Sequence, residues 1–284
     1  MIRLLIFFLL SLPALAQKTV FVKDAATNKG IAYVSVFTID GMLKTNTESD
    51  GSFNVPDEFL RNTFVFDAVG YESKQQELTD VVLLEPKSEL LEELVITPRL
   101  GTKEINVGKI DKRKESYIFF SEHSFLQGSE FRIKNDRNRF IKEVHVRTES
   151  KIDNAKFAVR IYNSNADGLP NELINEIPII INAKKGRSTS TINIEDLQIY
   201  VDSESFFVIF EQLYIEQNSR MIKWEDNKML KVYEPKIGIT SSEECFTWFL
   251  SGNKEWKKAE ILTDPNYYTK EKYYNYQIEV TLTN

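Results

Sequence analysis

Residues 45–57 read TNTESDGSFNVPD and place an acidic, polar turn directly before an alternating apolar run. An active-site loop, a calcium loop and a plain hairpin all share this appearance. Asp50-Gly51 suits a turn because glycine accepts positive φ and aspartate tolerates turn geometry. Phe53 and Val55 then lie on one face of a strand, since side chains alternate along it. We therefore interpret the stretch as a hairpin in an all-β domain.

Short β-rich runs flank this turn on both sides, at residues 19–22, 33–37, 64–66 and 81–84. A second pair, Asp40-Gly41, separates two apolar runs and predicts a tight type I′ hairpin turn. Short strands at close, regular spacing, with turn residues between them, are typical of a β-sandwich.

Four pieces of the sequence occur in the order of a known module: KTVFVKDAATNKGIAYVSV (18–36), TESDGSF (47–53), FVFDAVGYES (64–73) and LLEELVITP (90–98). Together they resemble the carboxypeptidase-regulatory-like domain, a seven-stranded transthyretin-like Greek-key sandwich, over residues 17–98. The resemblance implies an accessory module without activity of its own. The last piece is similar to the ending of this module where it precedes outer-membrane receptors in the bacterial envelope.

Residues 1–16 have the pattern of a secretory signal peptide, with Arg3 before an apolar run and Ala14-Leu15-Ala16 at the cleavage position. Cleavage is expected to leave Gln17 first. A retained anchor is the weaker interpretation because the run is short for a bilayer. The cleavage position is followed by Gln17 and not by a cysteine, which argues against a lipid anchor. We expect an exported protein without a transmembrane segment in the mature chain, periplasmic or outer-membrane-associated, with secretion as the alternative.

Residues 99–115 are polar, include the basic run KIDKRK, and are predicted to be a linker or an extended arm. From 116 to 284 alternating runs resume, at 130–134, 141–147, 157–162, 188–194 and 276–282. Residues 206–210 are apolar throughout, as in a strand buried on both faces. These patterns predict a second, jelly-roll-like β-sandwich. FAVRIYNSNADGLPNELI (157–174) and ESFFVIFEQ (204–212) resemble galactose-binding-like jelly-roll accessory domains.

Charge is distributed unevenly between the two predicted domains. Residues 17–98 hold seven Lys/Arg and fourteen Asp/Glu, a net charge of 7 − 14 = −7, whereas residues 99–284 hold twenty-eight of each sign. Neither balance is typical of nucleic-acid binding. Cys245 is the only cysteine, which excludes an internal disulfide, and we interpret it as a small buried hydrophobe.

The sequence offers no catalytic constellation. Neither His123 nor His145 is followed three residues later by the glutamate of a zinc carboxypeptidase. Adjacent carboxylates such as Glu92-Glu93 would diverge on a strand and make poor acid/base pairs. We therefore assign no catalytic, cofactor-binding or metal-binding residue and predict that the chain is not an enzyme.

Two stretches remain as candidate ligand sites. Asn163, Asn165 and Asp167 resemble the start of a calcium loop, but its twelfth position is Ile174, so a polar turn is favoured and calcium is the alternative. The C-terminal third is rich in aromatic residues that form either a ligand surface or packed interior. The candidates for that surface are Trp224, Trp248, Trp256, Tyr268 and Tyr274.

Three functions are compatible with these observations. The first is a non-catalytic envelope protein whose two β-sandwich modules bind another protein, in outer-membrane uptake or assembly. The second is a carbohydrate-binding accessory protein that uses the aromatic residues of the second domain. An unrecognised hydrolase is the third and has the least support, because the standard catalytic patterns are missing.

Overall fold

The computed structural model describes residues 17–87, 103–113, 116–118, 126–133, 137–223, 227–250, 255–259 and 273–284. The predicted signal peptide, the segment 88–98, His123, Trp224 and Tyr268 lie outside these residues. The described chain is all-β, as predicted, and its helical content is confined to three short 3-10 turns: η1 (Asp57–Phe59), η2 (Glu195–Leu197) and η3 (Glu216–Asn218). None of these helical turns has the length or apolar character that crossing a membrane requires.

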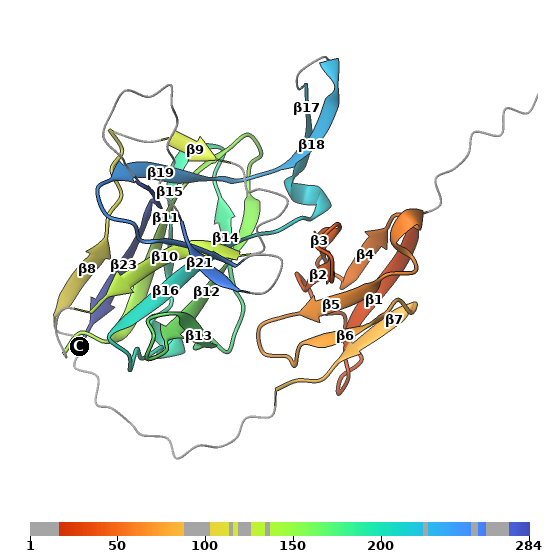
Figure 1. Cartoon of the computed structure of the whole chain (residues 1–284), viewed down its shortest axis with the longest axis horizontal. Coiled ribbons are helices and arrows are strands. Elements are labelled where there is room, and N and C mark those ends of the chain that lie inside the picture. Colours follow the sequence, from red (N-terminus) through yellow and green to blue (C-terminus); the bar gives the residue numbers. More distant parts are fainter. Residues whose placement is uncertain are drawn as a thin grey trace, which may run out of the picture.

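Residues 17–87 form a β-sandwich with the predicted seven strands (Figure 1). One sheet has β1 (Lys18–Asp24) in its centre, antiparallel to β4 (Ser52–Val55) and parallel to β7 (Val81–Leu84). The other has the order β3 (Lys44–Asn46), β2 (Ser35–Thr38), β5 (Thr63–Asp67) and β6 (Lys74–Glu77). The two sheets enclose one core, to which each contributes alternate residues, including Val20, Val22, Phe53, Phe64 and Phe66.

The turn at Asp50-Gly51 connects the two sheets of this module. The strands on either side of it, β3 and β4, belong to different sheets, so the prediction of a hairpin between paired strands was wrong. The Gly51 N–H donates to Glu48 O (3.0 Å), and its carbonyl accepts from Val22 N–H (2.8 Å). Gly51 has φ +86°, and a Cβ atom there would lie 2.6 Å from the Val22 oxygen. Glycine is therefore required by backbone conformation and by close approach.

The hairpin predicted at Asp40-Gly41 is present, because β2 and β3 pair antiparallel. Its turn type differs from the prediction. Thr38 N–H donates to the Leu43 carbonyl (3.0 Å), which leaves residues 39–42 in the loop. Of the Asp-Gly pair, Gly41 alone has positive φ (73°), whereas a type I′ turn needs it at both positions. Asp40 acts instead through its side chain, which accepts from the Met42 N–H (3.0 Å).

The second domain is a sandwich of two larger sheets. The sheet that we call the inner sheet contains, in order, β13 (Pro170–Leu173), β12 (Ala155–Ser164), β16 (Ser205–Gln212), β10 (Leu126–Arg132), β20 (Thr247–Leu250) and β21 (Trp256–Lys258), with β14 (Ile179–Ala183) also paired to β12. The outer sheet contains β22 (Tyr273–Tyr276), β19 (Lys236–Ser242), β11 (Phe140–Ser150), β23 (Ile278–Thr283) and β8 (Glu104–Gly108), with β15 (Gly186–Asn193) on β11 and β9 (Ser116–Ile118) on β19.

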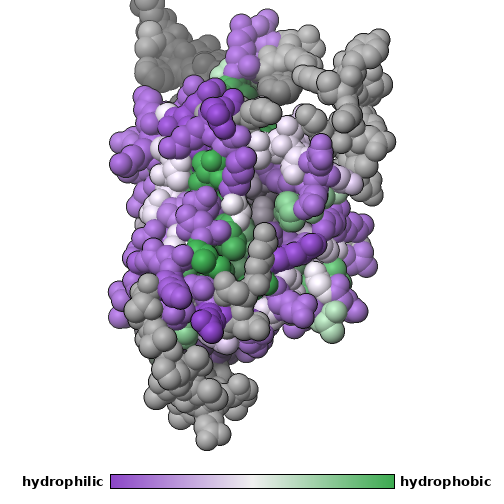
Figure 2. All heavy atoms as spheres, turned by 90° about the vertical axis from the view of Figure 1, so that its left-hand side faces the viewer, coloured by the Kyte–Doolittle hydropathy of each residue, from purple (hydrophilic) through white to green (hydrophobic). Residues whose placement is uncertain are grey.

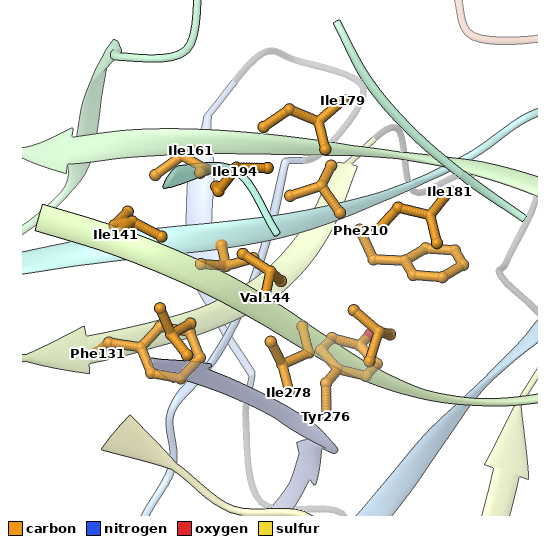
Figure 3. Packing of buried hydrophobic residues seen from close by; sticks show 14 of the residues in the cluster. Phe131, Ile141, Val144, Ile161, Ile179, Ile181, Ile194, Phe210, Tyr276 and Ile278 are labelled. Atoms are coloured by element: carbon orange, nitrogen blue, oxygen red, sulfur yellow. The ribbon is translucent and has the colours of Figure 1, made fainter. Parts of the chain in front are cut away.

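The core of the second domain lies between its two sheets. Figure 3 shows Phe131, Ile161 and Phe210 of the inner sheet among Ile141, Val144 and Ile278 of the outer sheet. Two phenylalanine rings in adjacent strands, Phe157 and Phe210, stack at 4.6 Å. All eight residues of β16 are buried, which confirms the prediction from the apolar run 206–210.

The linker predicted at residues 99–115 contains a strand of the second sandwich. β8 (Glu104–Gly108) pairs antiparallel with the C-terminal strand β23, and Ile105 and Val107 pack against the core. The linker interpretation was therefore wrong for residues 104–108. Residues 104–108 alternate only briefly between polar and apolar side chains. Such a short pattern does not indicate that they pair with residues 279–283 at the far end of the chain.

The two sandwiches pack face to face. The sheet β3-β2-β5-β6 turns its outer side chains, Ser35, Val65 and Asp67, towards the inner sheet of the second domain. Val65 is buried although it is not part of the N-terminal core, and hydrogen bonds connect the other two to β12 and β16. The result is a stack of four sheets, with the β4-β1-β7 sheet at one end and the outer sheet at the other.

Candidate functional site

A buried cluster of charges lies where the two sandwiches meet. Arg160 on β12 is at its centre. Its Nε and Nη2 donate to the two carboxylate oxygens of Glu211 on β16 (2.7 and 3.1 Å), and its Nη1 donates to Asp67 Oδ2 of the N-terminal module (2.5 Å). Ser35, also of that module, donates to Glu211 Oε1. The side chains of Arg160 and Glu211 are 5% and 3% exposed, so this pair is a bidentate ion pair held away from water.

The charges of this cluster alter each other's protonation. Burial alone would lower the pKa of Arg160, but Asp67 and Glu211 raise it well above its usual value. Lys44, on β3 of the N-terminal module, interacts electrostatically with Glu211 and Arg160 of this cluster. Burial lowers its pKa to about 7, Glu211 opposes this, and Arg160 adds to it.

Around the charges, backbone and ring contacts complete the junction. The Tyr214 N–H donates to Asn46 Oδ1 (2.9 Å), and the Tyr214 ring lies 5.2 Å from Lys44 Nζ. The Glu216 N–H donates to Glu48 Oε1 (2.7 Å), so the acidic stretch 45–57 contributes to this contact. Tyr33 packs against Leu213 and its apolar neighbours. Because Arg160, Glu211 and Asn46 are paired within the chain, the junction is suited to hold the modules together.

At one end of the stack, the β4-β1-β7 sheet leaves apolar side chains in solvent. Phe21, Val81 and Leu83 are 37%, 41% and 42% exposed. Phe21 and Val81 are register partners on adjacent strands, and Leu83 lies two residues further along the same face of β7. We call these three side chains the apolar end face. By contrast, the opposite end of the molecule, seen in Figure 2, is mostly hydrophilic with a small apolar area.

Two of the predicted aromatic candidates, Trp248 and Trp256, lie together over the inner sheet, but as packing residues. Trp248 is 8% exposed, meets Phe207 edge to face at 5.6 Å, and donates from Nε1 to Glu130 Oε2 (3.3 Å). The Trp256 and Tyr162 rings meet edge to face, with their centroids 5.8 Å apart. Since β21 and β12 lie near opposite edges of this sheet, the β20–β21 hairpin must curve across its face.

The remaining aromatic candidates do not join this pair. Tyr274 is exposed on β22 of the outer sheet, and Trp224 and Tyr268 lie outside the described residues. A sugar platform needs an open aromatic face, and Trp248 offers none because Phe207 and Lys258 cover it. The glycan alternative stays a prediction without a described surface to carry it.

The predicted calcium residues are engaged in the β12–β13 turn. Asn165 Oδ1 accepts from the N–H groups of Asp167 and Leu169 (3.0 and 2.9 Å), and Asn163 Oδ1 accepts from Ser203 Oγ (3.2 Å). Across the described ranges, no group of three or more His, Cys, Asp and Glu side chains is placed to hold a metal ion. The calcium alternative stays a prediction.

His145 and Cys245, two residues of types that serve nucleophilic chemistry, have structural contacts. Both ring nitrogens of His145 lie against threonine hydroxyls, Thr191 Oγ1 at 2.9 Å and Thr281 Oγ1 at 3.0 Å. The half-buried Cys245 lies with its Sγ 3.3 Å from the Ala259 carbonyl. These contacts hold both side chains in place within the second sandwich.

The junction and the apolar end face were not predicted. Arg160 interrupts the apolar run FAVRIY. A charge inside such a run is the only sequence signal that this side chain is buried against another part of the protein. Val81 and Leu83 belong to the run VVLL, which is apolar at positions that an exposed strand would normally make polar.

Comparisons with known proteins give no family. No family model matches the chain, and no curated protein matches it. Among solved structures, it is similar to the cysteine protease and lectin-like domains of Cwp84, a surface-layer-associated protein of Clostridium difficile, at 10% identity and a TM-score of 0.32 over 61% of this chain and 37% of that one. The clostridial protease after propeptide cleavage gives the same identity and TM-score over 85% and 50%.

A third similar structure is the major pilin subunit BcpA of Bacillus cereus, at 13% identity and a TM-score of 0.19, covering 86% of this chain and 67% of that one. The chain thus spans half or less of the two clostridial structures. Scores of this size carry no argument about activity or binding.

Proposed function

We propose that this chain is a non-catalytic, exported envelope protein that binds another protein through the apolar end face of its N-terminal module. As part of this proposal, the N-terminal module is a domain of the carboxypeptidase-regulatory-like kind that its sequence resembles. The proposal also includes a location in the periplasm or at the outer membrane, where the partner belongs to uptake or assembly machinery.

The observation that carries this proposal is the exposure of Phe21, Val81 and Leu83 on one sheet face. Apolar side chains that neighbour one another on a surface mark interaction sites more often than isolated ones do. The other sheet of the same module buries its outer face against the second domain, so the module already uses one face for protein contact. The end face is a second sheet surface of the same module, and its apolar side chains are open to solvent.

The junction supports the same function. It fixes the N-terminal module on the inner sheet through Arg160, Asp67 and Glu211, so that the end face points away from the second domain. A module held in this way presents its free face without an ordering cost at the moment of binding.

The experiment compares the mature chain with a variant that carries Val81→Lys and Leu83→Lys. Both are tagged at the C-terminus, crosslinked in intact cells and purified, and the co-purifying proteins are quantified. The control variant carries Ile39→Lys and Met42→Lys, which add the same charge to exposed positions in the β2–β3 loop of the same module.

We expect the native chain and the loop variant to retain the same protein at similar yield, and the end-face variant to lose it. Retention by the native chain and by both variants would exclude the end face as the binding surface. Co-purification of polysaccharide in place of protein would favour the glycan alternative.

A further inference from the structure

β15 (Gly186–Asn193) is an eight-residue strand at an edge of the outer sheet. It pairs with β11 over its whole length, from Gly186 opposite Ser150 to Asn193 opposite Glu143, and has no second strand partner among the described residues. The open edge of a strand presents a row of backbone N–H and C=O groups to which another strand can pair. The outer sheet can therefore be extended beyond β15.

The register identifies which backbone groups lie on this open edge. The N–H of Ile194, directly after β15, donates to the carbonyl of Lys142, which lies opposite it (2.8 Å). Because backbone groups point alternately to the two sides of a strand, the even-numbered residues of β15 bond to β11 and the odd-numbered residues point away. The backbone groups of Thr189 and Thr191 accordingly have no hydrogen-bond partner among the described residues.

The edge strand β7 of the N-terminal module differs from β15 in this respect. The outward carbonyl of Val81 accepts from Thr79 Oγ1 (2.7 Å). The outward carbonyl of Leu83 accepts from Lys74 Nζ (2.8 Å). Side chains thus occupy the acceptors of that edge, and a lysine at an edge is a known protection against pairing with a further strand.

β15 lacks such protection. Its sequence, GRSTSTIN, contains neither lysine nor proline. Its one charged side chain, Arg187, is paired within the chain, since Nε donates to Glu149 Oε1 (3.1 Å). The other side chains are small or uncharged, and threonine favours paired strands. Nothing in the strand itself therefore opposes pairing with a second copy of β15.

The charges at the two ends of β15 are complementary to each other in an antiparallel pair. Lys184 and Lys185 directly precede the strand and are exposed. Glu195 and Asp196 follow it in η2, and Asp196 is exposed. When two copies of β15 lie antiparallel, the lysines at the start of each strand meet the carboxylates at the end of the other, twice in one pair. A parallel pair would bring lysines to lysines, so the charges favour the antiparallel arrangement.

One register satisfies the backbone and the side chains together. With Ser190 opposite Ser190 of the second copy, odd-numbered residues lie opposite odd-numbered residues, so that their outward N–H and C=O groups bond to each other. Thr189 then lies opposite Thr191 of the second copy, and cross-strand threonine pairs are favourable. Arg187 lies opposite Asn193 of the second copy, which avoids a contact between like charges.

We propose that this protein forms a symmetric dimer in which two copies of β15 pair antiparallel and join the two outer sheets into one. Each copy contributes the same strand, so the contact is isologous and closes at two subunits. The occupant of the open edge is thus a second copy of this chain.

The dimer is independent of the apolar end face. β15 belongs to the outer sheet, whereas the end face lies on the β4-β1-β7 sheet at the other end of the stack. Residues near the β14–β15 turn contact a second copy of this chain and not the partner of the end face. Loss of one contact leaves the other intact, and the two proposals fail separately.

The test is sedimentation equilibrium of the mature chain over a range of concentrations. In the first variant, Thr189→Pro, the outward N–H is removed at a position where proline costs no bond to β11. The matched control is Thr189→Val, which keeps the backbone N–H; the Thr189 hydroxyl has no hydrogen-bond partner among the described residues, so its loss should be tolerated.

Two further variants, Lys184→Glu and Asp196→Lys, reverse the charge at one end of the strand each. Alone, each variant places like charges together at both ends of the dimer. Mixed in equal amounts, they form a pair in which every lysine again meets a carboxylate. Restored dimerisation in the mixture is a result that misfolding of either variant cannot produce.

We expect a reversible monomer–dimer equilibrium for the native chain and for Thr189→Val, and dimerisation about tenfold or more weaker in Thr189→Pro. Lys184→Glu and Asp196→Lys are each expected to dimerise more weakly than their mixture. A native chain that stays monomeric at every concentration would overturn the proposal. So would a dimer that Thr189→Pro leaves unchanged, or a mixture that dimerises no better than its two components.

Discussion

Replacement of Arg160 by methionine is the substitution for which the structure predicts the largest loss at the junction. Methionine keeps much of the side-chain volume and removes the guanidinium. The Glu211 carboxylate, 3% exposed, would then remain buried with Ser35 as its hydrogen-bond donor and the half-buried Lys44 nearby. An uncompensated buried charge is the costly result of breaking such a pair.

The expected cost follows from the contacts that are lost. Two hydrogen bonds to Glu211 are fully buried, whereas the third goes to Asp67, which is about a third exposed and contributes less. Removal of one partner of a buried ion pair costs about 3–5 kcal/mol of unfolding free energy, so we expect a loss in that range. Replacing Arg160 and Glu211 together by methionine removes both charges, and the double variant is expected to be more stable than Arg160→Met alone.

The assay is equilibrium denaturation in urea of the native chain, both single variants and the double variant, followed as a double-mutant cycle. An Arg160→Met variant within about 1 kcal/mol of the native chain would refute the reasoning. So would a double variant whose loss equals the sum of the two single losses, because the two charges would then not be coupled.

Gly51→Ala is expected to lower the thermal stability of the N-terminal sandwich by more than Gly186→Ala lowers that of the second sandwich. Both residues have positive φ, but only at Gly51 would the new Cβ meet backbone atoms, an added cost of about 1–3 kcal/mol in differential scanning calorimetry. Equal losses at the two glycines would contradict the packing argument. Lys44→Met is expected to stabilise the chain most at about pH 6. The native-state pKa of about 7 lies below the unfolded value of 10.5, so the cost of keeping the half-buried Lys44 charged is relieved as the pH rises between these values. A gain that does not change with pH in urea titrations would speak against it. Trp248→Ala is expected to cost about 3–5 kcal/mol in urea denaturation through loss of its contact with Phe207, and unchanged stability would restore Trp248 as a ligand-platform candidate.

The strands of both sandwiches could be predicted because alternation is a local property. Residues 141–147 and 157–162 alternate cleanly and form parts of β11 and β12, and the continuous apolar run 206–210 forms the fully buried β16. The strand at 104–108 could not be predicted from such patterns. Its partner is the last strand of the chain, and local alternation does not specify which strand a short polar segment will join.

The surfaces were less predictable than the strands. Arg160 alternates with apolar residues, a pattern typical of a side chain that faces solvent, but the N-terminal module covers that face of β12. Trp248 is a large, flat aromatic residue of the kind that forms ligand platforms, yet Phe207 and Lys258 pack against its ring. Whether an outward side chain meets water depends on packing between distant segments, which a single sequence pattern does not encode.

The most direct test of the account is site-specific photo-crosslinking from the apolar end face. A benzophenone amino acid is introduced at Phe21 or Leu83, and at Lys185 on the second domain as the control, in cells that export the protein. We predict that both end-face positions crosslink to the same protein and that position 185 does not. Crosslinks that are absent at the end face, or that are the same at all three positions, would contradict the claim that this protein binds a partner through its N-terminal module.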